Sequence, residues 1–112
     1  MLNEQEKIKS YAAALEHLAR AADITAPVEQ QLGRVLDALT QNPAIASYWA
    51  DPRLRDPAQT AFVEEAFGSR IHPLLLQFLI ILAGQKELPL LRPVAAAFRE
   101  LAGQRRQISV GE

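Results

Sequence analysis

The segment between Pro73 and Gly84 places the strongest constraint on the fold of this chain. It runs from Leu74 to Ala83 with a single polar side chain, Gln77, among ten residues. A helix that is apolar on every side cannot lie on a globular surface, because water would contact one flank whichever way the helix turned. The segment must therefore be surrounded by other helices, or by other helices together with a partner. It is far shorter than the ~20 residues that cross a bilayer, so we expect no direct membrane insertion.

Composition narrows the class of protein further. The chain has 112 residues, which suits one domain with one core, and it contains no cysteine, which excludes disulfides and thiolate metal sites. Twelve Lys and Arg residues balance thirteen Asp and Glu residues, and no basic face is visible, so we expect no nucleic acid as a partner. The first residues carry acidic side chains and no apolar stretch of the kind found in secretory signals. These features predict a soluble domain.

Apolar residues recur at steps of three and four along most of the chain, and Pro, Gly and Asn residues stand between the periodic stretches. This pattern predicts an all-α fold, a compact six-helix bundle. The helices are expected at about residues 3–22, from Thr25 through Leu39, from Pro43 through Trp49, from Asp56-Pro57 to Gly68, from His72-Pro73 to Gly84, and at about residues 87–102. Gly33 inside the second helix costs about 1 kcal/mol relative to Ala, so either another helix crosses closely there or the residue is suboptimal.

The C-terminal residues show a different pattern. Ile108 and Val110 alternate with Ser109, as in a strand, and Gly103 is a natural helix end. One short strand has no partner within the chain, so we expect a short extended C-terminal tail. We therefore predict a helical domain over residues 1–104 and a junction over residues 105–112 that leads toward a further segment.

Candidate chemical groups are sparse. His17 and His72 are the two histidines, and they form no pair with the spacing of metal ligands. Glu64 and Glu65 are neighbours on a helix and point about 100° apart, so a solvated face explains them better than a shared site. Trp49 and Tyr48 are a possible binding anchor, but packing at the edge of the core is favoured. We predict no catalytic residues, no metal and no cofactor.

The first and fifth expected helices offer a more specific hypothesis. The helix over 73–84 is apolar on every side, and the helix over 3–22 carries small alanines beside its main apolar stripe. If the two lie side by side, their outward flanks form a shallow apolar groove that suits one amphipathic helix. The alternative is that the other helices of the domain cover residues 73–84 completely. Periodicity alone leaves both arrangements open.

Four sequence blocks resemble one known family. Tyr11-Ala12-Ala13-Ala14-Leu15 is similar to the Tyr-Ala-x-Ala-Leu opening of the delta subunit of F-type ATP synthases, called the oligomycin-sensitivity-conferring protein in mitochondria. The blocks Gln77–Ala83, Leu88–Leu91 and Phe98–Leu101 resemble the Asn-Phe-Leu-x-x-Leu-Ala block of that family and the helix after it. The resemblance covers the N-terminal helical domain, here residues 3–104. It implies that a C-terminal domain, beginning with a strand, is absent, so that the chain is either a piece of a longer protein or a naturally short relative.

The resemblance implies a non-catalytic stator part of the peripheral stalk, which supports proton-driven ATP synthesis. In the family, this domain sits on the catalytic head and binds the N-terminal amphipathic helix of an alpha subunit between its first and fifth helices, while the absent C-terminal domain engages the b subunits. The implied location is peripheral, on the cytoplasmic face of a bacterial inner membrane, as part of the complex. Transferred to this chain, the implied groove residues are Tyr11, Ala14, Leu15, Leu18, Leu74, Phe78 and Ile81.

Two positions depart from the family pattern. The family usually has Asn-Gly-Arg before the Leu that opens its last helix, whereas this chain has Gln85-Lys86-Glu87, and an aromatic residue commonly stands where Glu16 is found. Both changes are expected to alter local contacts without removing the apolar pattern. The alternative function is a helical adaptor or regulatory domain whose groove binds an unrelated amphipathic peptide or a second copy of the chain.

Overall fold

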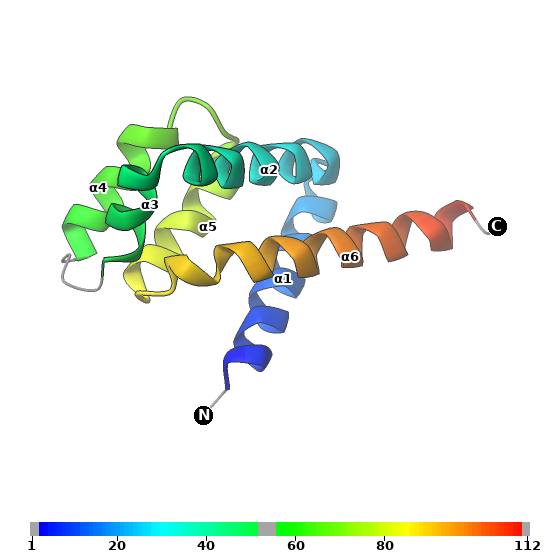
Figure 1. Cartoon of the computed structure of the whole chain (residues 1–112). Coiled ribbons are helices and arrows are strands. Elements are labelled where there is room, and N and C mark those ends of the chain that lie inside the picture. The colour runs from blue at the N-terminus through cyan, green and yellow to red at the C-terminus, as the bar shows by residue number, and fades with distance from the viewer. Residues whose placement is uncertain (1–2, 52–55, 111–112) are drawn as a thin grey trace.

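The computed structural model describes the backbone of residues 3–51 and 56–110, and the side chains of residues 3–49, 51 and 60–104. This part of the chain folds into six α-helices and one short 3₁₀ helix with no strand, which confirms the predicted all-α bundle (Figure 1). The elements are α1 (Glu4–Ala21), α2 (Thr25–Gln41), α3 (Pro43–Ala50), α4 (Asp56–Phe67), α5 (Pro73–Gly84), η1 (Leu88–Leu90) and α6 (Leu91–Val110).

Local sequence signals explain the starts of α1 and α5. At α1, the side chain of Asn3 accepts a hydrogen bond from the backbone N–H of Glu6 (2.8 Å), and the carboxylate of Glu6 accepts one from the N–H of Asn3 (3.2 Å). This reciprocal pair satisfies two N–H groups that a helix start otherwise leaves without partners. At α5, Pro73 occupies the first turn, and Nδ1 of His72 accepts a hydrogen bond from the N–H of Leu74 (3.0 Å). His72 is therefore a structural capping residue of α5.

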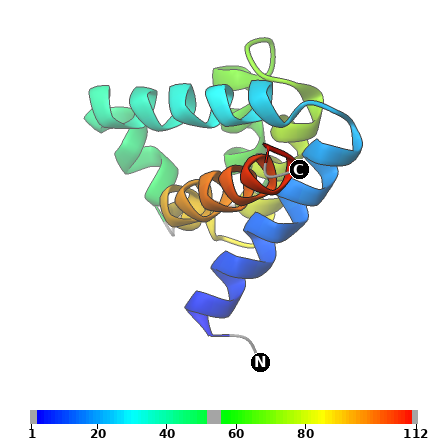
Figure 2. The ribbon, with the colours of Figure 1, turned by 90° about the vertical axis from the view of Figure 1, so that its right-hand side faces the viewer.

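The first and last helices of the chain pack against each other. α1 packs most extensively against α6, and α4 against α5, while α2 contacts α6, α3 and α1 (Figure 2). The resulting core takes fully buried side chains from every part of the domain, including Leu15, Val35, Val63, Leu79 and Phe98. Because α1 packs on α6, the core contains residues of both the first and the last helix.

Helix α5 lies in this core along most of its circumference, as its sequence requires. Leu75, Leu79 and Leu82 are completely buried, whereas Leu76 is half-buried. Ile81, by contrast, has 48% of its surface exposed. The alternative in which other helices of the domain cover α5 completely is therefore wrong for the described residues.

The expected extended tail is not present. Helix α6 continues without interruption to Val110, so Gly103 lies inside it, and the strand-like reading of Ile108 and Val110 was wrong. Gly ends a helix when it adopts the left-handed conformation, and no described glycine has a positive φ. The intervening Gln104-Arg105-Arg106-Gln107 consists of good helix formers, and an isolated strand would leave its backbone groups unpaired. In Figure 1 this end of α6 projects beyond the other helices.

Two residues singled out in the sequence have clear structural roles. Trp49 is buried near the C-terminal end of α3. Its indole N–H donates a hydrogen bond to the carbonyl of Leu88 (3.0 Å), which confirms packing of Trp49 at the edge of the core. A Cβ atom at Gly33 would lie 3.3 Å from Nη2 of Arg99, the far end of a flexible side chain. Gly33 is therefore not explained by a close crossing of helix backbones.

The turn after α5 contains a residue in an unfavourable backbone conformation. Lys86 has φ 61°, while the N–H of Lys86 bonds the carbonyl of Ala83 (3.0 Å) and the N–H of Glu87 bonds that of Leu82 (2.8 Å). This pair of bonds is the Schellman arrangement, in which glycine normally occupies the left-handed position because it lacks Cβ. Lys86 stands at the position of the Gly in the family's Asn-Gly-Arg.

We expect Lys86→Gly to stabilise the domain relative to Lys86→Ala. Both variants lose the lysine side chain, but only the glycine variant removes the Cβ that makes the left-handed conformation costly, so the difference in free energy of unfolding should be about 1 kcal/mol. Urea denaturation followed by circular dichroism measures this difference. Equal stability of the two variants, or greater stability of the alanine variant, would contradict the assignment of strain to this turn.

Candidate functional site

The residues predicted to line an apolar groove lie on α1 and α5, two helices that contact each other. The described side chains include three large hydrophobic residues that are strongly exposed, namely Leu18 (50%), Tyr48 (40%) and Ile81 (48%). Leu18 lies on α1 and Ile81 on α5, and both belong to the set predicted from the sequence. The remaining predicted members divide by depth: Ala14 is exposed, Tyr11 and Leu74 are half-buried, and Leu15 and Phe78 are buried.

The exposures separate a buried set from an accessible one. Leu15, with no exposed surface, and Phe78, with 7%, belong to the core, so Leu15 has no surface with which to touch a guest. The ring of Tyr11 packs edge-on against that of Phe78, with centroids 6.0 Å apart and an interplanar angle of 84°. This ring contact ties α1 to α5.

A polar cluster lies beside this ring contact. The hydroxyl of Tyr11 donates a hydrogen bond to the carboxylate of Glu87, and Nζ of Lys7 lies 2.8 Å from the other carboxylate oxygen. Glu87 belongs to the turn after α5, whereas Lys7 and Tyr11 lie one helical turn apart on α1. With Ser10 and Gln85, these residues line an open cleft of about 320 Å³. Sequence analysis noted Glu87 only as a departure from a family pattern and did not anticipate this cluster.

Comparison with known proteins decides the family. Residues 8–112 match the family model described as ATP synthase delta (OSCP) subunit. The chain belongs to the ATP synthase delta (OSCP) subunit family. Among curated delta subunits, it is 26% identical over 96 residues to that of a Cyanothece species and 29% identical over 108 residues to that of Anoxybacillus flavithermus. The chloroplastic delta subunit of Pyropia yezoensis is 28% identical over 100 residues.

These delta-subunit matches cover most of this chain but only part of each relative. They span 86%, 96% and 89% of the chain, and 52%, 60% and 54% of the Cyanothece, Anoxybacillus and Pyropia proteins respectively. The chain thus spans between half and three-fifths of the length of the curated delta subunits that it matches. The predicted division at residue 104, with a junction toward a C-terminal domain, stays a prediction.

Both departures from the delta-family pattern are accommodated. Glu16 is buried, and its carboxylate accepts a hydrogen bond from Nε of Arg20 one turn along α1 (3.2 Å). Glu87, the second departure, contacts Lys7 and Tyr11 of α1 through its carboxylate. The local sequence does not indicate this contact between α1 and the turn after α5.

The polar cluster makes the stability of this delta-family domain depend on pH. Two contacts hold the pKa of Glu87 below its ordinary value: the hydrogen bond donated by Lys7 has the larger effect, and the hydrogen bond donated by Tyr11 has the next largest. The pKa of Tyr11 is raised to about 12, mainly by burial and next by the hydrogen bond to Glu87. A lowered carboxyl pKa gives stability that is lost as pH falls through the folded-state pKa, and a raised phenol pKa gives stability that is lost as pH rises from about 10 to about 12.

We therefore expect Glu87→Gln to flatten the pH dependence of stability at both limits. The variant has no carboxylate to protonate in acid and no charge to oppose ionisation of Tyr11 in base, so its free energy of unfolding should change less than that of wild type below pH about 4.5 and above pH about 10. Urea midpoints measured across these ranges provide the test. Parallel pH profiles for the two proteins would show that the cluster does not couple to folding.

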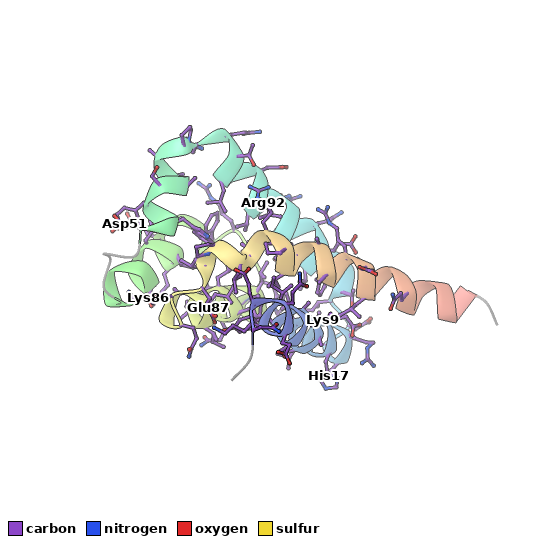
Figure 3. All side chains as sticks on the ribbon, turned by 60° about the horizontal axis from the view of Figure 1, so that its bottom comes forward. Lys9, His17, Asp51, Lys86, Glu87 and Arg92 are labelled. Carbon is purple, nitrogen blue, oxygen red and sulfur yellow. The ribbon has the colours of Figure 1, made fainter. Side chains whose placement is uncertain are left out.

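Other candidate groups have ordinary environments. His17 is exposed on α1 and points away from the domain (Figure 3), while Glu64 and Glu65 are exposed on α4 as expected. Within the described residues, no group of three or more His, Asp or Glu side chains is arranged to hold a metal ion. None of the helices, as far as the structure describes them, is both long and apolar enough to cross a bilayer.

Proposed function

We propose that this domain is a non-catalytic component of the peripheral stalk of F-type ATP synthase, which links the catalytic head to the stalk during proton-driven ATP synthesis. It does so by binding the N-terminal amphipathic helix of an alpha subunit in the groove between α1 and α5. The observation that carries the proposal is the exposure of Leu18 on α1 and of Ile81 on α5, two helices that contact each other and whose opposite flanks belong to the core. A helix-in-groove complex needs such a strip, with anchors supplied at successive turns.

The expected affinity fits a part of a larger assembly. Four apolar anchors on a guest helix contribute about 1.5–3 kcal/mol each when buried. Association and ordering of the guest cost about 4–15 kcal/mol, so the groove alone gives modest binding. A stator that resists torque needs further contacts, for which we propose the b subunits as partners through a C-terminal domain. The proposed location is peripheral, on the cytoplasmic face of a bacterial inner membrane.

The decisive experiment is an NMR titration of the ¹⁵N-labelled domain with a synthetic peptide of the N-terminal residues of the alpha subunit from the same genome. Amide shifts should saturate and should be concentrated on α1 and α5, around Leu18 and Ile81. Trp49 is a poor reporter because it is buried and bonded to Leu88. Absence of a saturable change, or shifts confined to other helices, would overturn the proposal. Self-association at micromolar concentration without a response to the peptide would favour the adaptor alternative.

A further inference from the structure

Tyr11 takes part in both the apolar groove and the polar cleft. Its ring packs against Phe78 in the groove, and its hydroxyl lies in the cleft lined by Lys7, Ser10, Gln85 and Glu87. The side chain is half-buried, so packing alone covers only part of it. A tyrosine on a helix has more than one allowed χ1 rotamer, and a hydrogen bond at the distal end of the ring selects among them.

Glu87 is itself held in place before it reaches Tyr11. Its side chain is 14% exposed, and one carboxylate oxygen pairs with Lys7 while the other accepts the hydrogen bond from Tyr11. The backbone N–H of Glu87 bonds the carbonyl of Leu82 at the end of α5. The acceptor is thus fixed to the end of one groove helix, and the donor belongs to the other.

The charges around this cleft do not favour recognition of a charged guest. The charged side chains that line this cleft and the adjoining one are Glu4, Lys7, Lys86 and Glu87, two of each sign. The carboxylate of Glu87 is already shared between a cation and a phenol. Its arrangement suits holding Tyr11 better than attracting a cation from a partner.

We infer that Glu87 is a positioning residue for the groove: it fixes the ring of Tyr11 against Phe78, so that a guest helix meets a preformed apolar wall at this end. This inference rests on the proposed function, since it assigns a role within the same groove. Preorganisation strengthens binding because the free domain does not have to order the side chain when the guest arrives.

Two measurements on a Tyr48→Phe background, in which Tyr11 is the only tyrosine, test the inference. The first is the tyrosinate absorbance titration, with circular dichroism at each pH to verify folding. With Glu87 present, the pKa of Tyr11 is about 12. In the Glu87→Ala variant this pKa should be lower but stay above 10, because burial also raises it. The second is calorimetric titration with the alpha-subunit peptide at neutral pH.

We expect Glu87→Ala and Tyr11→Phe each to weaken peptide binding by about tenfold, and the double variant to bind no more weakly than either single variant. Glu87→Gln, whose amide oxygen still accepts from the phenol, should recover affinity to within about threefold of wild type. The matched control Glu65→Ala, an exposed carboxylate on α4, should bind like wild type.

The outcomes separate this inference from the proposed function. If the background protein does not bind the peptide, the proposed function fails and this inference fails with it. If the background protein binds, but Glu87→Ala binds equally well while the pKa of Tyr11 falls, the hydrogen bond is structural and Glu87 does not position the groove. Additive losses in the double variant would likewise overturn the inference, because Glu87 would then act independently of Tyr11.

Discussion

Replacing Ile81 by Asp is expected to weaken binding of the alpha-subunit peptide by at least about a hundredfold while leaving the domain folded. Ile81 is 48% exposed in the free domain, so a carboxylate there stays in contact with water. A docked apolar helix would remove that water and leave the charge without a partner, at a cost of several kcal/mol. Each 1.4 kcal/mol corresponds to a tenfold loss of affinity. Calorimetric titration of the variant with the peptide measures the effect.

The matched control introduces the same charge on another exposed helical surface. Ala96 is exposed on α6, outside the proposed groove, so Ala96→Asp should bind the peptide as wild type does. Circular dichroism melts of both variants verify that each is folded at the titration temperature. A folded Ile81→Asp variant with unchanged affinity would show that the guest binds elsewhere.

Replacing Leu79 by Ala is expected to reduce the free energy of unfolding by about 2–5 kcal/mol. Leu79 is completely buried on the opposite flank of the same helix, and truncation to Ala leaves a cavity that the surrounding helices cannot fill. Since domains of this size are stable by only about 5–15 kcal/mol, the change removes a large share of the total. Urea denaturation monitored by Trp49 fluorescence gives the value, because this indole is buried in the native core.

Ile81→Ala is the matched control for Leu79→Ala, because it removes a comparable side chain from the exposed flank of α5. It should cost less than about 1 kcal/mol of stability, yet weaken peptide binding through the lost apolar contact. A loss of stability for Leu79→Ala that is no larger than that for Ile81→Ala would contradict the division of α5 into a covered flank and an open one.

The helices could be predicted because their boundaries depend on residues that are close by in the sequence. Proline at a first helical position, as at Pro43 and Pro73, acts within one turn and is visible in the sequence. The end of α6 was not predictable in this way. Three alternating residues at 108–110 are too few to distinguish a strand from a helix, and Gly103 ends a helix only if its backbone turns left-handed, which it does not.

The apolar part of the groove could be inferred from the sequence, but its polar end could not. Leu18 and Ile81 follow from helical periodicity together with a family resemblance, and their exposure supports the inference. The bond between Tyr11 and Glu87 joins residues 76 positions apart, and no local pattern specifies such a contact. Periodicity also did not predict how deeply each residue is buried. Leu15 belongs to the same apolar stripe as Leu18 but has no exposed surface.

The packing of α1 on α6 determines when this domain can fold during synthesis. Helix α1 leaves the ribosome before α6, yet α6 is the helix against which α1 packs most extensively. Until α6 emerges, α1 has no complete surface against which to bury its apolar stripe, and packing of that stripe supplies most of the stability of a helix in a protein. This contact therefore forms later than the contacts between helices that are neighbours in the sequence.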